Sequence, residues 1–457
     1  NKTTLTSSEK ISQVLAISLP WLILFILPLV YFYSEINALF LLQIFVAAAA
    51  ILISYQEKSI STGSPTIFAT MLVLFLLATR ATWLSCDFST SWPALIKYLS
   101  WLQLFFILSA LARKPEFQES LVNASISTGI LHGLLAIQEY IEAPPIPATW
   151  VDPALKEHVR TRCAGLFTDP NVFGAFLAVV FLFLTLALIR ADSPKMRLVC
   201  GSALFLTGFA ELTTLSRGSW IALLISLSLF TLLFWKGKSE SGRDLRPLLV
   251  IIIILAAIAM LGPFKYRIFS IVKTKDMTIA QRSLIFKGFK EGFAKIPTSG
   301  FGPHTFSQIY PRFRAVGGDY PLYAHNEILH SLVETGHLSS ILLILLVLII
   351  FWQALRSPPD GFQIAGLAAM LCLLIHNLSG FSSRILPTAL LIILAAALTR
   401  PQNSSYKAHP ALKRVFFAAM VLAAALTVLL GGYSFNINRI MQQAYFELQV
   451  GNADRAL

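Results

Sequence analysis

The sequence predicts an all-α protein, a polytopic membrane helix bundle with one large helical loop outside the membrane. Of its 457 residues, 56% are hydrophobic and 13% are charged, and the mean hydropathy is +0.70. These values exclude an ordinary soluble domain. Apolar runs near the ~20 residues needed to cross ~30 Å of hydrocarbon recur along the chain. One polar, basic segment, residues 264–338, interrupts them.

The apolar runs predict about 12–13 spans that share a single membrane bundle. The candidate spans are residues 12–31, 37–54, 66–84, 94–112, 121–140, 172–190, 198–214, 219–235, 248–263, 339–355, 362–379, 385–399 and 412–432. We expect the first to stay as a helix, because the amino terminus lacks the compact core and cleavage site of a signal peptide. The predicted units are the first nine spans in residues 1–263, the loop 264–338, the last spans in 339–432 and a tail, 433–457.

Lys and Arg in the short connections predict the orientation. They gather in one alternate set of connections, as Lys58, Arg113, Lys114, Arg190, Lys195, Arg197, Lys236, Lys238, Arg243, Arg246, Arg356, Arg400, Lys407, Lys413 and Arg414. The short connections 32–36 and 85–93 of the other set hold none. Cytoplasmic loops carry the excess of basic residues, so the first set is expected inside. The loop 264–338, the Pro-rich segment 141–171, the turn at Arg217 and the tail are then expected outside.

The four cysteines leave one alternative open. Cys86 and Cys163 are expected on the outer side, where a disulfide can persist. Cys200 and Cys372 fall within spans and are typical of small buried hydrophobes. Four cysteines spread so widely form no disulfide framework, so a Cys86–Cys163 bond is the less favoured reading.

The charge of the loop indicates an anionic ligand. Residues 264–338 hold ten basic and five acidic side chains, a net charge of +5. A basic surface facing outward beside lipid suits phosphates, pyrophosphates or anionic headgroups. The alternative is a solvated basic loop that touches the membrane surface.

Two patterns divide the first half of the loop. Ile285, Phe289 and Phe293 recur at spacing four, which predicts an amphipathic helix over 280–295 lying at the membrane interface. The Gly300-x-Gly302 turn follows, where glycine lets the backbone approach a ligand or another helix closely. It does not follow a strand, so it is no nucleotide fingerprint, and a simple turn is the alternative.

The segment 324–337 predicts a helix that leads into the next span. Its polar face, Glu327, His330, Glu334 and His337, is interpreted as a solvated side that closes down on the bundle. Glu334-x-x-His337 has the spacing of carboxylate-bridged metal sites, but the sequence holds no second such pair to complete one. No metal is therefore expected.

His325 is the candidate general base. It is expected at the start of this helix, where the positive end of the dipole disfavours an extra proton and keeps the imidazole neutral. A neutral imidazole beside a ligand can accept a proton at pH 7. The alternative is a histidine that only caps the helix.

The order of these elements resembles a known superfamily. Ser216-Arg217-Gly218 after a span, Arg282 in a basic loop, the Gly300-x-Gly302 turn, and His325-Asn326 separated by nine residues from Gly336 are together similar to the O-antigen ligase and polymerase superfamily. Within it the chain looks most like the lipopolysaccharide O-antigen ligases. The motifs occupy only about 215–220 and 280–340, while the likeness in topology covers most of the bundle.

The resemblance implies a reaction. A glycan passes from undecaprenyl pyrophosphate to a sugar hydroxyl of the lipid A core, on the periplasmic side of a Gram-negative inner membrane. The implied partners are this donor, the lipid A-core acceptor and membrane lipids, with no nucleic acid. His325 would take the acceptor proton in an inverting attack, and Arg217 and Arg282 would bind the pyrophosphate. No cofactor and no metal is implied, in agreement with the absence of an Asp-x-Asp pair.

Secondary candidates surround these three residues. Arg267, Arg312 and Arg314 are candidates for the pyrophosphate or for lipid A phosphates, and His304 and Tyr323 for the acceptor side. Arg217 has the alternative of a side chain that snorkels to lipid headgroups.

Three other functions stay open. A protein O-oligosaccharyltransferase of the same superfamily shares the donor chemistry, but the His-rich Pro-Trp element expected near its amino terminus is not found. An O-antigen polymerase differs only in its acceptor. A flippase for the same carrier should hold ionisable residues at mid-membrane depth and repeated halves, whereas the spans are nearly free of such residues and no repeat is detected.

Overall fold

The chain forms the predicted helical membrane bundle. The computed structural model describes residues 7–56, 64–147, 150, 158–236, 244–269, 277–356, 358–399 and 410–449, and these contain helices and no strands. Ten of the described helices are long and apolar enough to cross a membrane, and three shorter apolar helices accompany them. Each of the thirteen overlaps one of the predicted spans, but the last runs beyond its predicted end at residue 432, since α18 continues to Gln449.

The first nine spans precede the loop. They are α1, η1 and α2 as one run (Ser7–Trp21, Leu22–Ile26, Leu27–Tyr33), α3 (Glu35–Gln56), α4 (Pro65–Trp83), α5 (Phe88–Leu111), α6 (Pro115–Glu142), α7 (Pro170–Arg190), α8 (Pro194–Thr213), α9 (Arg217–Lys236) and α10 (Arg246–Ala259). The last four follow it as α15 (His337–Ala354), α16 (Gly361–Asn377), α17 (Leu386–Leu398) and α18 (Pro410–Gln449), with η6 (Ser382–Arg384) between α16 and α17. The helix α18 includes the first part of the predicted tail, and residues 450–457 lie outside the described chain.

Local sequence explains where many of these helices start. Proline occupies the first or second position of α4, α6, α7, α8, α10 and α17, where its missing N–H costs no helical hydrogen bond. The side chains of Ser64, Asp87, Asp169, Ser193 and Asp360 accept hydrogen bonds from the first-turn N–H groups of the helices that follow them.

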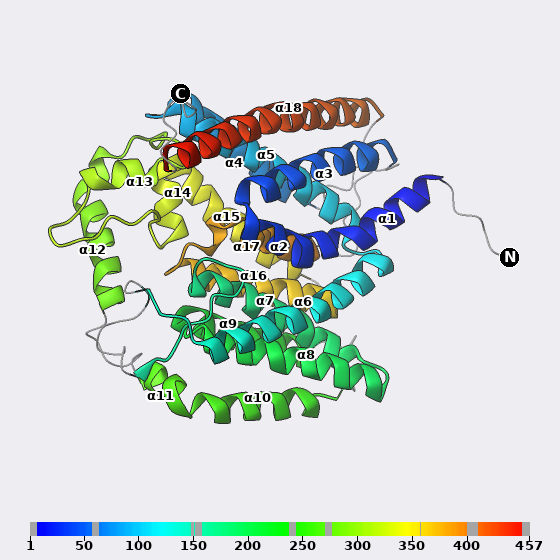
Figure 1. The fold of residues 1–457 in the computed structure, drawn as a ribbon. Helices are drawn as coiled ribbons and strands as arrows, with labels where there is room; N and C mark the ends of the chain where they lie inside the picture. Colours follow the sequence, from blue (N-terminus) through cyan, green and yellow to red (C-terminus); the bar gives the residue numbers. More distant parts are fainter. Residues whose placement is uncertain are drawn as a thin grey trace.

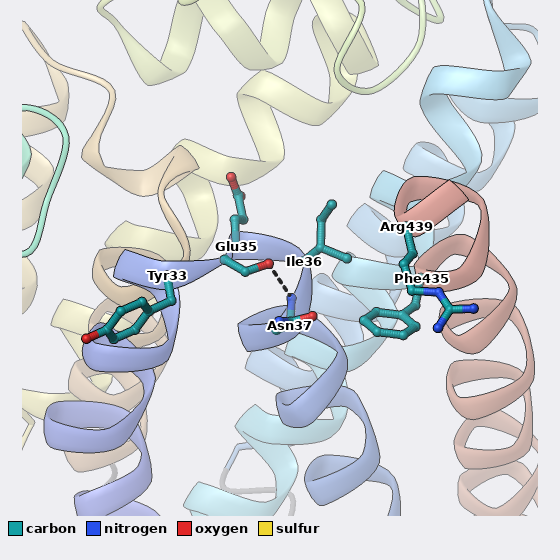
Figure 2. A pocket seen from close by; sticks show the side chains of 7 residues that line it. Tyr33, Glu35, Ile36, Asn37, Phe435 and Arg439 are labelled. Atoms are coloured by element: carbon teal, nitrogen blue, oxygen red, sulfur yellow. Dashed lines mark hydrogen bonds between the residues drawn. The ribbon is translucent and has the colours of Figure 1, made fainter. Parts of the chain in front are cut away.

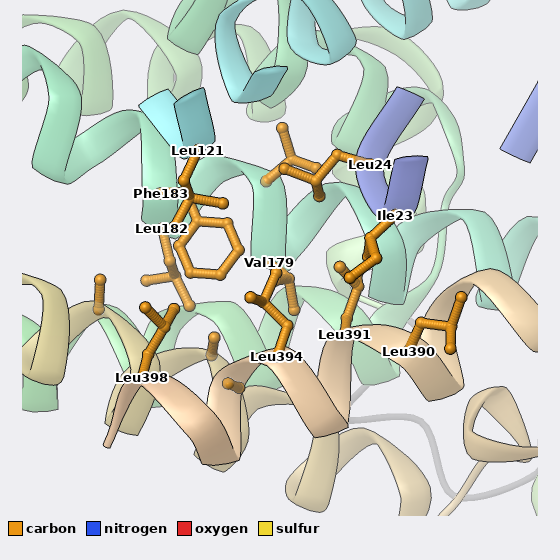
Figure 3. Packing of buried hydrophobic residues seen from close by; sticks show 14 of the residues in the cluster. Ile23, Leu24, Leu121, Val179, Leu182, Phe183, Leu390, Leu391, Leu394 and Leu398 are labelled. Atoms are coloured by element: carbon orange, nitrogen blue, oxygen red, sulfur yellow. The ribbon is translucent and has the colours of Figure 1, made fainter. Parts of the chain in front are cut away.

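The centre of the bundle is α7. Every residue of its apolar window is buried, and it packs against α6, α8, α9, α16 and α17. Figure 3 shows Val179, Leu182 and Phe183 of this helix beside Leu391 and Leu394 of α17. The burial of α7 on all sides explains why its sequence is apolar without a polar stripe.

The connections alternate between two ends of the bundle (Figure 1). At one end, Cys86 N donates to Phe301 O at 3.0 Å, and Asn326 Nδ2 donates to Leu378 O at 3.0 Å, so short turns meet the large loop. We call this the loop end. At the other end, Arg113 pairs with Asp360 at 3.4 Å. This is the alternation that the charge pattern predicted, while the compartment that each end faces stays a prediction.

The loop itself is built from short helices around a small core. They are α11 (Gly262–Phe269), α12 (Met277–Gly292), η4 (Phe293–Lys295), α13 (Phe306–Ile309), η5 (Tyr310–Arg312) and α14 (Glu327–Thr335). Ile285 and Phe289 of α12 pack with Phe306, Tyr310 and Phe313. The predicted amphipathic face is thus partly correct, since Ile285 and Phe289 are buried but Phe293 is 49% exposed.

The structure also tests the expectations for the cysteines and for ionisable residues in the spans. Cys86 is exposed, Cys163 is buried, and all four cysteines are free, so the less favoured disulfide does not form. The spans also hold more buried ionisable groups than expected, because Lys97, Glu211 and His132 lie within α5, α8 and α6 at 4% exposure or less.

Candidate active site

The glycine turn fastens the loop to the bundle. Gly300 and Gly302 have φ angles of +73° and +113°, in the region that favours glycine. A Cβ on Gly300 would lie 2.4 Å from the backbone of Glu334, and one on Gly302 would lie 2.0 Å from Ser85 Oγ. Phe301 N and Gly302 N donate to Val333 O and Glu334 O, each at 2.9 Å. Close approach of the protein's own backbone therefore explains this motif.

His325 lies just before α14, not within it. Asn326 is the N-cap, with its Oδ1 accepting from Leu329 N at 2.9 Å, so the helix begins at Glu327. The backbone of His325 is left-handed, with φ +51°, which is uncommon for a side chain of this size. Its ring meets the ring of Phe381 edge to face at 5.1 Å.

The environment of His325 keeps its ring neutral. Burial lowers the pKa of His325 from 6.5 to about 3, and the positive charges of Arg282, His330 and His376 act in the same direction. The expected neutrality agrees with this, but its main cause is desolvation and not the helix dipole. Neither ring nitrogen makes a hydrogen bond to the part of the chain that the structure describes, so one of them is free to accept a proton.

The prediction that the polar face of α14, next to His325, is solvated is wrong. Glu334 is 1% exposed and His330 is 3% exposed, and Arg384 from η6 binds Glu327 and Glu334 together. The distances are 2.6 Å from Nη2 to Glu327 Oε1 and 2.9 Å from Nη1 to Glu334 Oε2. A pattern on one helix could not reveal that its charged face meets an arginine from a turn fifty residues later.

The Glu334 carboxylate is the centre of a wider network. His330 Nε2 lies 2.9 Å from Glu334 Oε1, and Ala324 N donates to His330 Nδ1 at 3.4 Å. Burial raises the pKa of Glu334, but His330 and Arg384 outweigh it and hold that pKa below its ordinary value. Lys97 Nζ from α5 donates to the carbonyl oxygen of Arg384 at 3.4 Å. These contacts fix α14, and with it His325, against the bundle.

Arg217 and Arg282 come to the same region from different elements. Arg217 begins α9 and is half-buried. A Cβ on the next residue, Gly218, would lie 3.6 Å from Cδ2 of His376 in α16. Arg282 of α12 acts electrostatically on both His325 and His376. His376, which the sequence analysis missed, lies next to Gly218 and interacts electrostatically with Arg282 and His325.

The secondary arginines separate into two groups. Arg267 is 5% exposed, and its Nε donates to Leu215 O at 2.9 Å, so it holds the left-handed turn that precedes Arg217. Arg312 and Arg314 are exposed on the far part of the loop. Arg314 Nη1 donates to Gly318 O at 2.7 Å and its guanidinium covers the Tyr320 ring. No contact within the described residues joins Arg312 or Arg314 to His325.

Of the two acceptor-side candidates, Tyr323 is linked to His325 through Phe381, whereas His304 interacts with the Glu334 network. Tyr323 stacks on Phe381 at 4.6 Å and 9°, so Phe381 contacts both Tyr323 and His325. Burial raises the pKa of Tyr323, and the Glu35 carboxylate adds to this effect. His304 is exposed, with φ +61°, and it interacts electrostatically with Lys97, Glu334 and Arg384.

One family model matches part of the chain. Residues 202–344 match the family model described as O-antigen ligase. The match supports the superfamily to which the motifs pointed, and this family is glycosyltransferase-like. The matched residues include Arg217, Arg282 and His325, whereas His376 and Arg384 lie beyond them. No curated protein matches the chain.

The residues that the sequence analysis missed carried weak signals. Arg384 is a lone basic residue in a short connection at the loop end, where the charge pattern predicts few. His376 is a polar residue at the end of an apolar span. Neither signal names a partner, since both partners come from distant parts of the chain.

Proposed function

We propose that this protein is an O-antigen ligase, which moves O-antigen polysaccharide from undecaprenyl pyrophosphate to a lipid A-core sugar hydroxyl. The reaction is proposed to occur at the loop end, facing the periplasm of a Gram-negative inner membrane. The observation that carries the proposal is a neutral, unpartnered His325 within electrostatic reach of Arg282. The match of residues 202–344 to the O-antigen ligase family supports it.

The proposed reaction is a direct displacement. The acceptor hydroxyl gives its proton to a ring nitrogen of His325 as its oxygen attacks the anomeric carbon. The bond from that carbon to the pyrophosphate oxygen breaks on the opposite face, which inverts the configuration. Undecaprenyl pyrophosphate leaves with the electron pair, and the guanidinium groups of Arg217 and Arg282 stabilise its negative charge. No metal ion takes part in the proposal.

The test is a transfer assay with purified full-length protein, lipid-linked O-antigen and rough lipopolysaccharide. His325→Ala is expected to lower the transfer rate by about 10²–10⁴-fold, as removal of a general base does, and to keep donor binding. His337→Ala is the matched control, because His337 packs on Phe293 and not at the site. Exhaustive chelation is expected to leave the wild-type rate unchanged.

Three results would contradict the proposal. If His325→Ala folds, binds the donor and transfers glycan at the wild-type rate, His325 is not the general base. Longer glycan on the carrier itself, with none on lipopolysaccharide, would make the protein a polymerase. Glycan on a protein acceptor would make it a protein O-oligosaccharyltransferase.

A further inference from the structure

A polar pocket lies at the loop end, away from Arg217 and outside the residues that match the O-antigen ligase family model. It is formed where the α2–α3 turn faces the last part of α18 (Figure 2). Its lining residues are Tyr33, Ser34, Glu35, Ile36, Asn37, Phe435 and Arg439, and its volume is about 620 Å³. This volume falls in the ~300–1,000 Å³ range of small-molecule sites.

The chemistry of the lining suits a sugar that carries a phosphate. Phe435 stacks on Phe40 at 4.6 Å and 17°, so its ring is held, and Tyr33 is 84% exposed. Flat aromatic faces of this kind can pack against the C–H side of a sugar ring. Glu35 accepts hydrogen bonds from hydroxyl groups, and the fork of Arg439 matches phosphate oxygens. Within the described chain neither of these charged residues forms an ion pair.

The surroundings of the pocket suit an amphiphile. The helices that border it expose large apolar side chains, including Phe32 (53%), Leu41 (41%), Ile44 (43%), Ile437 (39%) and Ile440 (60%). In a membrane such side chains face lipid tails. A headgroup in the pocket can therefore keep its acyl chains in the bilayer along α3 and α18.

Electrostatic interactions and ring contacts relate the pocket to the base. Glu35 interacts electrostatically with Tyr323 and with Lys97. Tyr323 stacks on Phe381, and Phe381 meets His325. This route to His325 does not pass through Arg217 or His376, which leaves that flank for the pyrophosphate donor.

We propose that this pocket binds the phosphorylated sugar headgroup of the glycolipid acceptor, whose glycan extends past Tyr323 to His325. The identity of the bound lipid as acceptor rests on the proposed function. Phe435 supplies the surface for the sugar ring, Arg439 binds the phosphate and Glu35 binds hydroxyl groups. The acceptor therefore approaches along the exposed apolar sides of α3 and α18, and the donor approaches beside α9 and α16.

Binding is measured first, without catalysis. Full-length protein in lipid nanodiscs is titrated with rough lipopolysaccharide and with the same lipid after enzymatic dephosphorylation. Arg439→Ala is expected to weaken binding of the phosphorylated lipid by about 10-fold or more, and to leave binding of the dephosphorylated lipid unchanged. Phe435→Ala is expected to weaken binding of both. Arg356→Ala is the matched control, because Arg356 is an arginine at the other end of the bundle, where its guanidinium covers the ring of Trp352.

Two results would contradict the proposal that the pocket binds the acceptor headgroup. The first is equal affinity for the phosphorylated lipid in wild type, Arg439→Ala and Phe435→Ala. The second is competition by phosphatidylglycerol vesicles as effective as that by rough lipopolysaccharide, which would make this a site for ordinary anionic phospholipid.

The transfer assay separates this proposal from the proposed function. Arg439→Ala is expected to raise the KM for the acceptor and to leave kcat and the KM for the donor unchanged. If the wild type transfers glycan but the variants keep the wild-type affinity and KM, the pocket assignment fails and the ligase function stands. If the wild type transfers to no acceptor, the ligase function fails and the binding experiment alone decides the pocket.

Discussion

Arg384 forms a two-point ion pair with Glu327, in which Nη2 lies 2.6 Å from Oε1 and Nε lies 3.1 Å from Oε2. Its third nitrogen, Nη1, binds Glu334 seven residues further along α14. One guanidinium from the α16–α17 turn thus holds both the first and the last turn of the helix that follows His325.

Removal of this arginine should destabilise the protein strongly. Arg384→Ala takes from the 1%-exposed Glu334 its arginine partner and leaves only His330, and breaking a buried pair in this way typically costs ~3–5 kcal/mol. Arg384→Lys keeps the charge but loses the fork, so an intermediate loss is expected. Arg113→Ala, which breaks the more exposed pair with Asp360, should cost only ~0–1 kcal/mol. Thermal unfolding in detergent measures all three, and equal shifts for Arg384→Ala and Arg113→Ala would contradict the assignment.

The rate of transfer should not fall near pH 6.5, the ordinary pKa of a histidine. The pKa of His325 is lowered to about 3, so the ring stays neutral from pH 7.5 down to pH 5.5 and the competent fraction does not fall there. Arg282→Gln removes a positive neighbour and should move the acid limb of kcat/KM toward neutral pH. Lys287→Gln, which removes an exposed charge from the same helix, is the control. A wild-type rate that halves near pH 6.5 would refute the neutral base.

The same group links stability to pH. The unfolded chain binds a proton on His325 below its ordinary pKa of 6.5, whereas the folded protein does not until about pH 3. The unfolded state therefore binds more protons in this window, and the contribution of His325 to stability is lost as the pH falls from 6.5 toward 3. His325→Gln removes the effect. Its stability, measured by thermal unfolding, should decrease less steeply over this range than that of the wild type.

The glycine turn offers a steric test with an internal control. A Cβ on Gly302 would lie 2.0 Å from Ser85 Oγ, whereas one on Gly317 would meet nothing within 4 Å, although both residues have positive φ. Gly317→Ala should lower the free energy of unfolding by only ~1–2 kcal/mol, the cost of a side chain in the left-handed region. Gly302→Ala adds a clash and should also detach the loop from the bundle, so that limited proteolysis cuts the 264–338 segment faster. Equal proteolysis of the two variants would argue against the contact.

The arginines of the loop end should differ in their effect on transfer. Arg217→Ala is expected to lower kcat by about 10²–10³-fold, the usual cost of losing one oriented donor to a developing negative charge. Arg314→Ala should have little effect, because its guanidinium is engaged by Gly318 O and Tyr320. The transfer assay with saturating donor compares them. A similar loss in both variants would indicate a diffuse electrostatic role in place of a defined site.

The sequence predicted the spans well, because apolar length is a local property that the membrane enforces. The roles of His325, Arg217 and Arg282, whose spacing carries the family resemblance, stay predictions. The sequence failed on the charged face of α14, since Glu334 is buried only because Arg384 arrives from another turn. Lys97 and His376 were missed for the same reason, as each is the single basic residue of an apolar span and has its contacts elsewhere.

The sequence also predicted the wrong cause for the neutral ring of His325. The helix was expected to include this residue, and its dipole was expected to keep the ring neutral. Asn326 takes the cap, so His325 stays outside the helix and desolvation becomes the main cause. Burial depends on the packing of Phe381 and α12, which no window of the sequence contains.

Asn326 caps α14 and also binds Leu378 O, while Gly336 joins the other end of α14 directly to α15. The base is thereby mounted on the membrane helices and not on a hinged loop. Its alignment is set as much by the length of the 378–384 turn as by its own neighbours. One residue inserted into that turn should abolish transfer while Arg217, Arg282 and His325 all remain, so relatives that differ in the length of this turn should also differ in the segment 324–336.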